Sequence, residues 1–576
     1  MPTAPELDIE LFRYHTFDKL TAALQALAVA YPKLSRLESI GKSHEGRDLW
    51  LMTVTNFETG LDTDKPAYWI DGNIHAAEVT GSAVSLYTIH YLLTNYGRAN
   101  SEPNNAEAAQ VKNLLDTRTF YILPRHTPDG AERVLTTPRR LRSSTRPYPH
   151  DEDKDGLYAE DLDGDGAIRQ MRVADPNGDW RISERDPRLL VKRLPHEVGG
   201  QYYRVYPEGL VRNYDGYNLK IPGPKEGLDL NRNYGYDWSP DNEQVGAGPF
   251  PLSEPETHAV STFWVNHRNI CGCQSYHTFA GVILRPYSGK NDDAFATHDL
   301  DVYKAMGERG TALTGYPMAS IFHEFRYDPK TYLRGAFLDW AYEHQGVFAI
   351  STELWDTIRL AGIEKRDFIT FMSKQRDIEQ ELQVVCWMWE NLPDSFKEWE
   401  HFDHPQLGPL EIGGWNFVYS WQNPPPESQW LRDICHQNML FSLDCAAISP
   451  LLTMPILKVE QVGEADVYKV TAVVENSGFL PTYVSKKAQE RKFLKPLTIE
   501  LQAGEGVELL SGEARRELGH LEGRSNKQTI SPFQPGFSSD YRVVAEWFVR
   551  GSQAGSSFVV EAYCQRGGRV KRTHTL

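Results

Sequence analysis

Apolar positions along the chain alternate between helical and strand-like spacing. Residues 18–33 place apolar side chains at helical intervals and predict a helix, and residues 34–55 show strand-like alternation around Gly41 and Gly46. Residues 67–70 are a short apolar run that predicts a buried strand, and residues 79–93 predict a helix rich in Ala, Leu and aromatic side chains. Residues 71–78 therefore form a turn from a strand to a helix.

The same alternation recurs further along the chain. Further strands are predicted at residues 120–123, 271–276, 282–284 and 347–352, with helical stretches between them. Strands that alternate with helices are typical of an α/β fold. We therefore expect a mixed, largely parallel sheet flanked by helices, with functional side chains at strand ends and in loops.

Two regions depart from this pattern. Residues 143–227 form a long polar insert rich in Asp, Gly, Pro and Arg, and from Leu451 onward short strands such as residues 468–474 and 558–562 are bounded by Gly and Pro. A chain of 576 residues is also too long for one ordinary domain. We expect a catalytic domain over residues 8–450, which contains the insert, and an antiparallel β-sandwich over residues 451–576.

Composition narrows the classes of partner. Lys and Arg total 61 and Asp and Glu total 78, so the formal charge is −17, which argues against nucleic acid and anionic lipid as partners. No apolar run is long enough to span a membrane, and the six cysteines lack the paired spacing of a disulfide framework. The first residues show no secretory signal, so we expect a cytoplasmic location, or a secreted or periplasmic one if the N-terminus has been trimmed.

Four side chains with metal and proton chemistry lie at predicted strand ends. His75 and Glu78 share the turn at residues 71–78, His277 follows the strand at 271–276, and Glu353 follows the strand at 347–352. Two histidines and one carboxylate fill three positions of a tetrahedral Zn²⁺ shell and leave the fourth for water. The second carboxylate is then free to act as a base. A solvated helix start is nevertheless the commoner cause of an isolated His-x-x-Glu.

An ordered set of neighbouring motifs favours the zinc site over a solvated helix start. The motifs are Ile40-Gly41-Lys42-Ser43-His44-Glu45-Gly46-Arg47, Pro128-Asp129-Gly130, Gly227-Leu228-Asp229-Leu230-Asn231-Arg232-Asn233-Tyr234 and Ser253-Glu254-Pro255-Glu256-Thr257. Together with His277 and Glu353 they resemble the M14 zinc carboxypeptidases, the carboxypeptidase A/B/T family, over about residues 12–390. The resemblance implies the carboxypeptidase fold and one catalytic zinc ion.

The resemblance also implies roles for individual residues around the zinc. His75, Glu78 and His277 match the family's zinc ligands, and Asp229 matches the carboxylate that orients a ligand imidazole. Glu353 matches the general base, which takes the proton of a zinc-bound water and passes it to the leaving amine.

Further residues match the family positions that bind the substrate's terminal carboxylate and stabilise the oxyanion. Asn231 and Arg232 match the pair that grips the substrate's terminal carboxylate, to which a guanidinium can donate two bonds at once. Arg142 matches the arginine that stabilises the oxyanion, with Arg140 as the alternative in the same basic run.

Two positions depart from the family pattern, and a third bears on which substrate side chain is accepted. Ala77 stands where the family carries an arginine, which leaves the range of substrates open. The mobile tyrosine of the digestive enzymes is assigned to Tyr332, one residue out of register, with Tyr327 as the alternative. Leu338 occupies the position that sets the character of the specificity pocket, and it favours apolar or aromatic C-terminal side chains.

The insert contains two Asp-x-Asp-x-Asp-Gly runs that suit Ca²⁺. Their twelfth positions are Leu162 and Arg172, so neither run supplies the bidentate glutamate of an EF-hand. The alternative is a solvated acidic loop. If calcium binds, we expect a structural ion remote from the chemistry, with ligands among Asp151, Asp153, Asp155, Glu160, Asp161, Asp163 and Asp165.

The leading hypothesis is a zinc metallocarboxypeptidase that acts on a peptide or peptide-like substrate. A related zinc amidohydrolase acting on peptidoglycan stem peptides, polyglutamyl tails or acyl-amino acids is the alternative within the enzymes, because Ala77 replaces the family's arginine. A calcium-dependent binding protein with a vestigial zinc site is the alternative from another class. The oligomeric state stays open.

Overall fold

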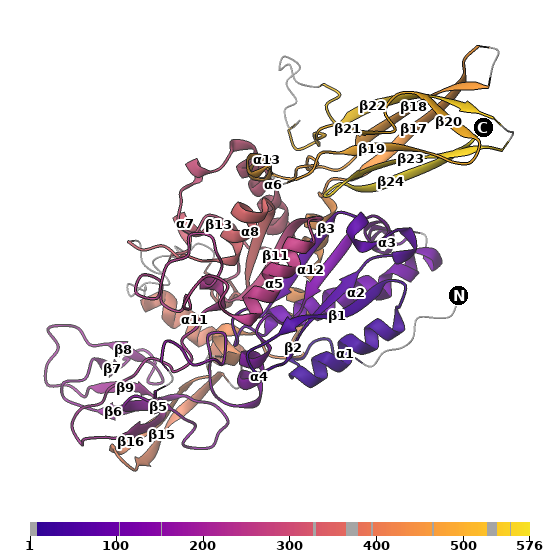
Figure 1. Ribbon diagram of the computed structural model, residues 1–576. Coiled ribbons are helices and arrows are strands. Elements are labelled where there is room, and N and C mark those ends of the chain that lie inside the picture. Colours follow the sequence, from indigo (N-terminus) through magenta and orange to yellow (C-terminus); the bar gives the residue numbers. More distant parts are fainter. Residues whose placement is uncertain are drawn as a thin grey trace.

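A mixed eight-stranded sheet forms the centre of the molecule (Figure 1). The computed structural model describes residues 9–102, 104–150, 152–326, 330–363, 378–392, 395–416, 418–463, 466–492, 494–526, 538–552 and 555–576. In sheet order the strands are β1 (Ser35–Lys42), β2 (Asp48–Val54), β4 (Thr119–Leu123), β3 (Ala67–Gly72), β11 (Ile270–Thr278), β14 (Phe348–Leu354), β12 (Val282–Arg285) and β13 (Met318–Ser320). The central strands β4, β3, β11 and β14 run parallel to one another, which confirms the predicted fold class.

Helices cover both faces of this sheet. They are α1 (Phe17–Ala30), α2 (Thr80–Ser101), α3 (Ala106–Thr117), α4 (Pro128–Thr136), α5 (Pro255–Asn266), α6 (Thr297–Thr314), α7 (Ile321–Glu324), α8 (Phe337–Gln345), α9 (Thr357–Leu360), α11 (Ile378–Asn391) and α12 (Gln429–Ala447). Side chains of β3 alternate between two cores, because successive residues of a strand point to opposite faces. Tyr68 and Ile70 join the core under α1, α2, α3, α6 and α12, whereas Ala67 and Trp69 join the core under α5 and α8.

The polar insert folds as part of a second β region. Its strands are β5 (Gly156–Ala159), β6 (Gln170–Ala174), β7 (Trp180–Ile182), β8 (Leu190–Lys192), β9 (Tyr203–Pro207) and β10 (Gly209–Arg212). A later hairpin, β15 (Phe396–His404) and β16 (Gly408–Trp415), completes a six-stranded antiparallel sheet in the order β15-β16-β6-β9-β7-β8. β5 and β10 pair with each other in a separate two-stranded sheet, and we call all eight strands the satellite β module. The sequence pattern did not predict the six-stranded sheet, because β6 to β10 span only three to five residues each.

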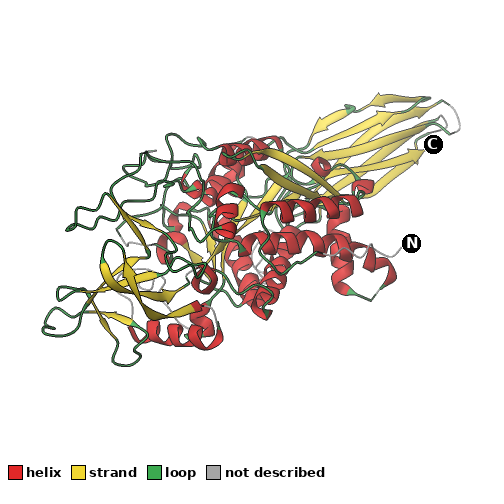
Figure 2. Cartoon of the chain, turned by 90° about the horizontal axis from the view of Figure 1, so that it is seen from below, coloured by secondary structure: helices red, strands yellow, loops and turns green. Residues whose placement is uncertain are grey.

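The C-terminal region is an antiparallel β-sandwich, as predicted. One sheet contains β17 (Leu452–Gln461), β18 (Val467–Asn476), β22 (Arg542–Gly551) and β20 (Val507–Ser511), and the other contains β21 (Arg515–Glu517), β19 (Thr498–Ala503), β23 (Ser557–Cys564) and β24 (Gly568–Thr575). Apolar side chains of both sheets, among them Val470, Trp547 and Val560, form one core. In Figure 2 the helices gather around the central strands, and the satellite β module and the sandwich lie at opposite ends of the molecule.

The sandwich is fastened to the turn that precedes β14. The buried guanidinium of Arg566 donates to the carbonyl oxygens of Gln345 and Gly346. Ser485, which caps the short helix α13 (Lys486–Arg491), also donates its hydroxyl to the Gly346 carbonyl at 2.8 Å. These contacts hold the start of β14, the strand that carries Glu353.

Candidate functional site

The turn between β3 and α2 is sharp and internally hydrogen-bonded. Asn73 adopts a φ of 63°, and its side-chain amide donates to the carbonyl oxygens of His75 (2.7 Å) and Ala76 (3.1 Å). The start of α2 passes close behind the turn, since a Cβ placed on Gly72 would lie only 2.5 Å from the carbonyl carbon of Gly81. This geometry brings the side chains of His75 and Glu78 to the same side of the turn.

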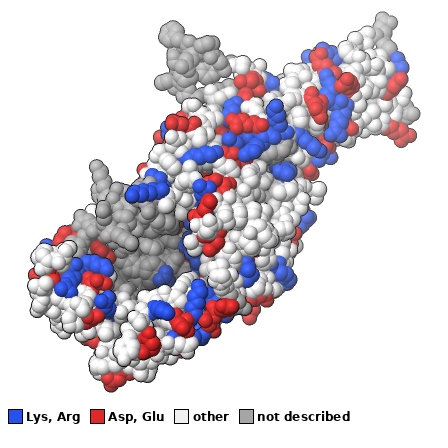
Figure 3. Space-filling view, turned by 60° about the vertical axis from the view of Figure 1, so that its left-hand side comes forward, with Lys and Arg blue, Asp and Glu red and all other residues white. Residues whose placement is uncertain are grey.

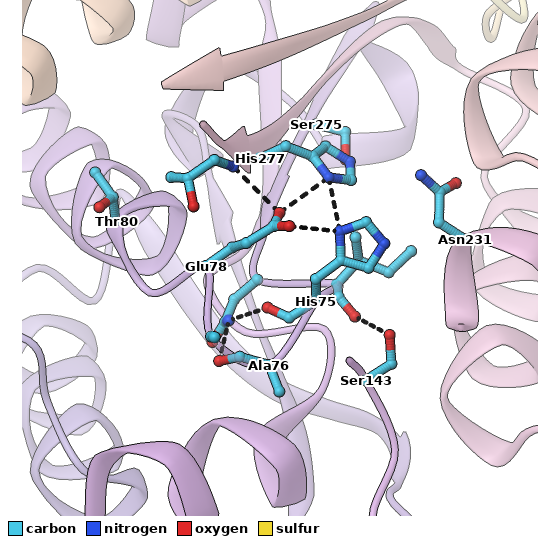
Figure 4. Close-up of polar contacts among 12 residues, drawn as sticks. His75, Ala76, Glu78, Thr80, Ser143, Asn231, Ser275 and His277 are labelled. Carbon is cyan, nitrogen blue, oxygen red and sulfur yellow. Dashed lines mark hydrogen bonds and ion pairs between the residues drawn. The ribbon is translucent and has the colours of Figure 1, made fainter. Parts of the chain in front are cut away.

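His75, Glu78 and His277 converge, as Figure 4 shows. Glu78 Oε1 lies 2.9 Å from His75 Nδ1, and Glu78 Oε2 lies 3.1 Å from His277 Nδ1. The two Nδ1 atoms face each other at 3.1 Å, and each of the three residues is at most 4% exposed. Two nitrogens and a carboxylate oxygen that meet in one buried place are the donor set of a zinc site, and the residues present fit that ion.

Asp229 fixes the orientation of His75. Its Oδ1 lies 3.1 Å from His75 Nε2, and its Oδ2 accepts from Arg142 Nε at 2.8 Å. Burial alone would raise the pKa of Asp229, but the charges of Arg142 and Arg232 outweigh burial and hold that pKa well below its ordinary value. An ionised Asp229 favours the tautomer with the proton on Nε2, which leaves the lone pair of Nδ1 available to a metal.

Glu353 lies on the strand next to His277. β11 and β14 are parallel, and His277 is paired in register with Glu353. Burial raises the pKa of Glu353 well above its ordinary value, and the charge of Glu78 adds to the rise.

One open cavity is lined both by these groups and by a set of apolar side chains, which we call the apolar chamber. Its polar side contains His75, His277, Glu353, Arg142, Asn231 and Arg232. The rest of its lining comprises Leu284, Ser288, Ile321, Phe325, Leu333, Ala336, Leu338 and Ser351. The cavity can therefore receive a molecule that has a charged group next to an apolar side chain.

The cavity is lined by four residues that the sequence predicts to contact the substrate, Arg142, Asn231, Arg232 and Leu338. Arg142 lines the cavity, with Nη1 3.5 Å from Glu78 Oε1, whereas Arg140 is not among the lining residues. Arg232 is 5% exposed and donates to the carbonyl oxygen of Asn231, whose Oδ1 accepts from the backbone N–H of Phe337 at 2.9 Å. The short turn Leu230–Arg232 presents both residues, and Asp229 caps it by accepting from Asn231 N–H at 2.9 Å.

The tyrosine assignment stays a prediction. Tyr332 is not among the residues that line the cavity, and its hydroxyl accepts from the guanidinium of Arg334. The alternative, Tyr327, lies outside the described residues.

The acidic runs of the insert are already bonded to protein groups. Asp161 accepts from the backbone N–H groups of Gly164 and Gly166, Lys397 donates to Asp163 at 2.8 Å, and Arg169 donates to Asp165 at 2.5 Å. Asp153 pairs with Arg212, Asp155 accepts from the amide of Asn213 at 2.8 Å, and the backbone N–H of Glu160 donates to the Glu208 carbonyl. Asp151 lies outside the described residues, and calcium binding stays a prediction.

Glu208 is a member of this cluster that the sequence did not indicate. Its buried carboxylate lies close to those of Asp161 and Asp163 and accepts from the backbone N–H groups of Leu162 and Arg169. It follows both Asp-x-Asp-x-Asp-Gly runs on the separate strand connection between β9 and β10, so no local spacing could have assigned it.

The hydropathy of the helices and the distribution of surface charge both concern what the protein can contact. Within the described residues, no helix combines the length and the hydropathy that crossing a membrane requires. Figure 3 shows Lys and Arg interspersed with Asp and Glu, so on this face the formal charge of −17 is not gathered into one patch.

Comparisons with known proteins show which protein families the chain resembles. The model of a family described as zinc carboxypeptidase matches residues 20–386, and that of a domain of unknown function matches residues 451–575. Carboxypeptidase A2 of Rattus norvegicus is 24% identical over 350 residues, which cover 60% of this chain and 63% of that protein. Carboxypeptidase B of Astacus astacus is 28% identical over 167 residues, which cover 29% of this chain and 44% of that protein.

The chain thus spans between 44% and 63% of the length of these relatives. Among solved structures, that of thrombin-activatable fibrinolysis inhibitor is similar with a TM-score of 0.44 and 17% identity, over 77% of this chain and 76% of that chain. The family model matches well over half of the 576 residues and includes the His75, Glu78 and His277 cluster. The chain therefore belongs to the zinc carboxypeptidase family.

Proposed function

We propose that the protein is a zinc carboxypeptidase that hydrolyses the last peptide bond of peptides whose C-terminal side chain is apolar. The observation that carries this proposal is the cavity, in which the His75, Glu78 and His277 cluster, Glu353 and Arg232 lie next to an apolar chamber. A bound zinc ion would polarise the scissile carbonyl and lower the pKa of a water molecule. His75 Nδ1, a Glu78 carboxylate oxygen and His277 Nδ1 would hold the ion.

Other residues of the cavity would bind the substrate, transfer protons and stabilise the oxyanion. Arg232 binds the terminal carboxylate of the substrate, and Asn231 adds its side-chain amide. Glu353 takes a proton from the attacking water and passes it to the leaving amine. Arg142, held by Asp229, donates to the oxyanion as charge develops on the carbonyl oxygen.

The apolar chamber supports the preference for the substrate's last side chain. Leu284, Ile321, Phe325 and Leu338 contribute hydrocarbon surface, which gains free energy when it buries a Leu, Phe or Tyr side chain. A polyglutamyl tail would place a carboxylate in this chamber, and burying a charge without a partner is costly. The lining therefore favours a peptide with an apolar end over a polyglutamyl substrate.

Elemental analysis joined to an assay of residue release tests the proposal. We expect one zinc ion per chain and release of C-terminal Phe or Leu from blocked dipeptides, with both signals lost after chelation and restored by added zinc. Peptides that end in Lys or Glu are the comparison within the same assay. A protein without stoichiometric zinc would refute the proposal, and release only from muropeptides would favour the amidohydrolase alternative.

A further inference from the structure

A short segment beyond the family-matched residues contacts the turn that carries His75 and Glu78. This segment, residues 418–423, comprises the π-helical turn Val418–Gln422 and Asn423, and it connects β16 of the satellite β module to α12. Asn423 is fully buried. The family model ends at residue 386, so this segment lies outside the matched region.

Asn423 forms four hydrogen bonds, three of which hold the turn on both sides of Glu78. Its Oδ1 accepts from the backbone N–H of Thr80 at 3.2 Å and from the Thr80 hydroxyl at 2.8 Å. Its Nδ2 donates to the carbonyl oxygens of Ala77 at 2.8 Å and Val418 at 2.9 Å. A single side chain therefore links the residue before Glu78 to the first residue of α2.

Apolar packing around Ala77, the position where the family carries an arginine, also holds the turn in place. Val418 packs in a small cluster with Ala76, Ala77, Val134 and Leu141. Ala77 is 3% exposed, so its side chain is enclosed in this cluster. The segment thus holds the ligand turn through side-chain packing as well as through hydrogen bonds.

The same segment also reaches the strand end that carries Glu353. The carbonyl oxygen of Ser420 accepts from Trp355 Nε1 at 2.8 Å. Trp355 is buried, follows Glu353 by two residues and has a φ of 68°, so its indole ring fixes a turn that bends directly after the proposed base. One segment therefore contacts both the metal-ligand turn and the turn behind the base.

We propose that residues 418–423 are a positioning element of the metal centre, in which Asn423 holds Glu78 in place for the ion and Ser420 holds the turn behind Glu353. This inference rests on the proposed zinc site. Groups that orient metal ligands through hydrogen bonds act on affinity without touching the ion, and losing one typically weakens metal binding by about 10- to 100-fold. Asn423 is accordingly a positioning residue.

The test compares two buried asparagines. Asn476 in the sandwich also makes four hydrogen bonds, because its Nδ2 donates to the carbonyls of Leu480 and Glu522 and its Oδ1 accepts from the N–H groups of Leu451 and Gly478. We expect Asn423→Ala to weaken zinc binding about tenfold or more in a chelator competition and to shift the visible absorption bands of the cobalt-substituted protein. Asn476→Ala should lower the melting temperature but leave zinc affinity and the cobalt spectrum unchanged.

Two milder variants separate the contacts and guard against misfolding of Asn423→Ala. Thr80→Val removes the hydroxyl that donates to Asn423 and lies 3.3 Å from the Tyr14 hydroxyl, and it should weaken zinc binding roughly threefold, the effect of one hydrogen bond. Trp355→Phe removes the indole donor and should lower kcat while zinc affinity stays at the wild-type value.

The outcomes distinguish this inference from the proposed function. Wild-type zinc affinity and an unchanged cobalt spectrum in both Asn423→Ala and Thr80→Val would overturn it, as would an equal loss of affinity in Asn476→Ala. A wild-type protein that binds no zinc would instead overturn the proposed function, and this inference with it.

Discussion

Glu353 and His277 are register partners on the adjacent parallel strands β14 and β11. Their separation is therefore set by the hydrogen bonds of the sheet, not by a loop. His75 and Glu78 reach the same place from the end of β3, which pairs with the other edge of β11. Groups on neighbouring strands keep their spacing when a substrate enters, which suits a base that must act on a water held by its neighbours.

Removing the carboxylate of Glu353 should separate proton transfer from metal binding. We expect Glu353→Gln to lower kcat by about 10²- to 10⁴-fold, the usual contribution of a general acid–base group, while zinc content stays at the wild-type value. Steady-state kinetics and elemental analysis of the same preparation provide both measurements. Unchanged turnover with zinc retained would remove Glu353 from the mechanism.

Arg232 should matter only for substrates with a free terminal carboxylate. Arg232→Lys replaces a two-pronged donor by a point charge, and we expect kcat/KM for a free peptide to fall about tenfold or more. Hydrolysis of the same peptide with an amidated C-terminus should change little. The control is Arg309→Lys, because Arg309 is exposed, pairs with Asp444 and is not among the residues that line the cavity. Equal losses on both substrates would argue against carboxylate recognition by Arg232.

Leu338 should determine which final side chain is accepted. Leu338→Asp places a carboxylate in the apolar chamber, so peptides that end in Phe or Leu should lose about tenfold or more in kcat/KM, because an unpaired charge is costly there. Peptides that end in Lys or Arg should gain relative to them. A panel that varies only the last residue measures this change, and an unaltered order of preference would place the side-chain pocket elsewhere.

Asp339 should make stability depend on pH. Burial raises the pKa of Asp339 to about 7, and the charges of Asp237 and Glu343 add to the rise, although Ser288 N–H donates to both carboxylate oxygens. Because this pKa is raised in the folded state, the folded protein holds a proton that the unfolded chain has released. The contribution of Asp339 to stability is therefore complete below about pH 4 and is lost as the pH rises through about 7.

The matching variant is Asp339→Asn, which stays neutral at every pH. Between roughly pH 4 and pH 8, its free energy of unfolding should rise relative to that of the wild type by about 4 kcal/mol. Urea denaturation of both proteins across that range measures the difference. Parallel pH profiles of the two proteins would show that Asp339 does not titrate with a raised pKa.

Local spacing and a family resemblance together explain what the sequence could predict. His75 and Glu78 are three residues apart on one turn, and His277 and Glu353 follow apolar strands, but only the ordered motifs that resemble the M14 carboxypeptidases assigned these four residues to one site. The apolar run at residues 67–70 likewise predicted β3, because a strand buried on both faces is apolar throughout.

Contacts between distant segments were not predictable in this way. Asn423 has no neighbouring motif, and its importance appears only when it lies against Ala77 and Thr80. The pairing of β16 with β6 was not predictable either, because a short strand with mixed polarity does not indicate which strand it will pair with.

This pairing sets a limit on how the protein can be shortened. A fragment that stops at residue 386 would lack β15 and β16, and the edge of β6 that now bonds to β16 would face solvent. Arg172 would also lose Glu411, to which it donates at 2.7 Å. Uncovered strand edges recruit other chains. A soluble recombinant catalytic unit should therefore extend at least through the hairpin, and fragments cut at the family boundary are expected to aggregate.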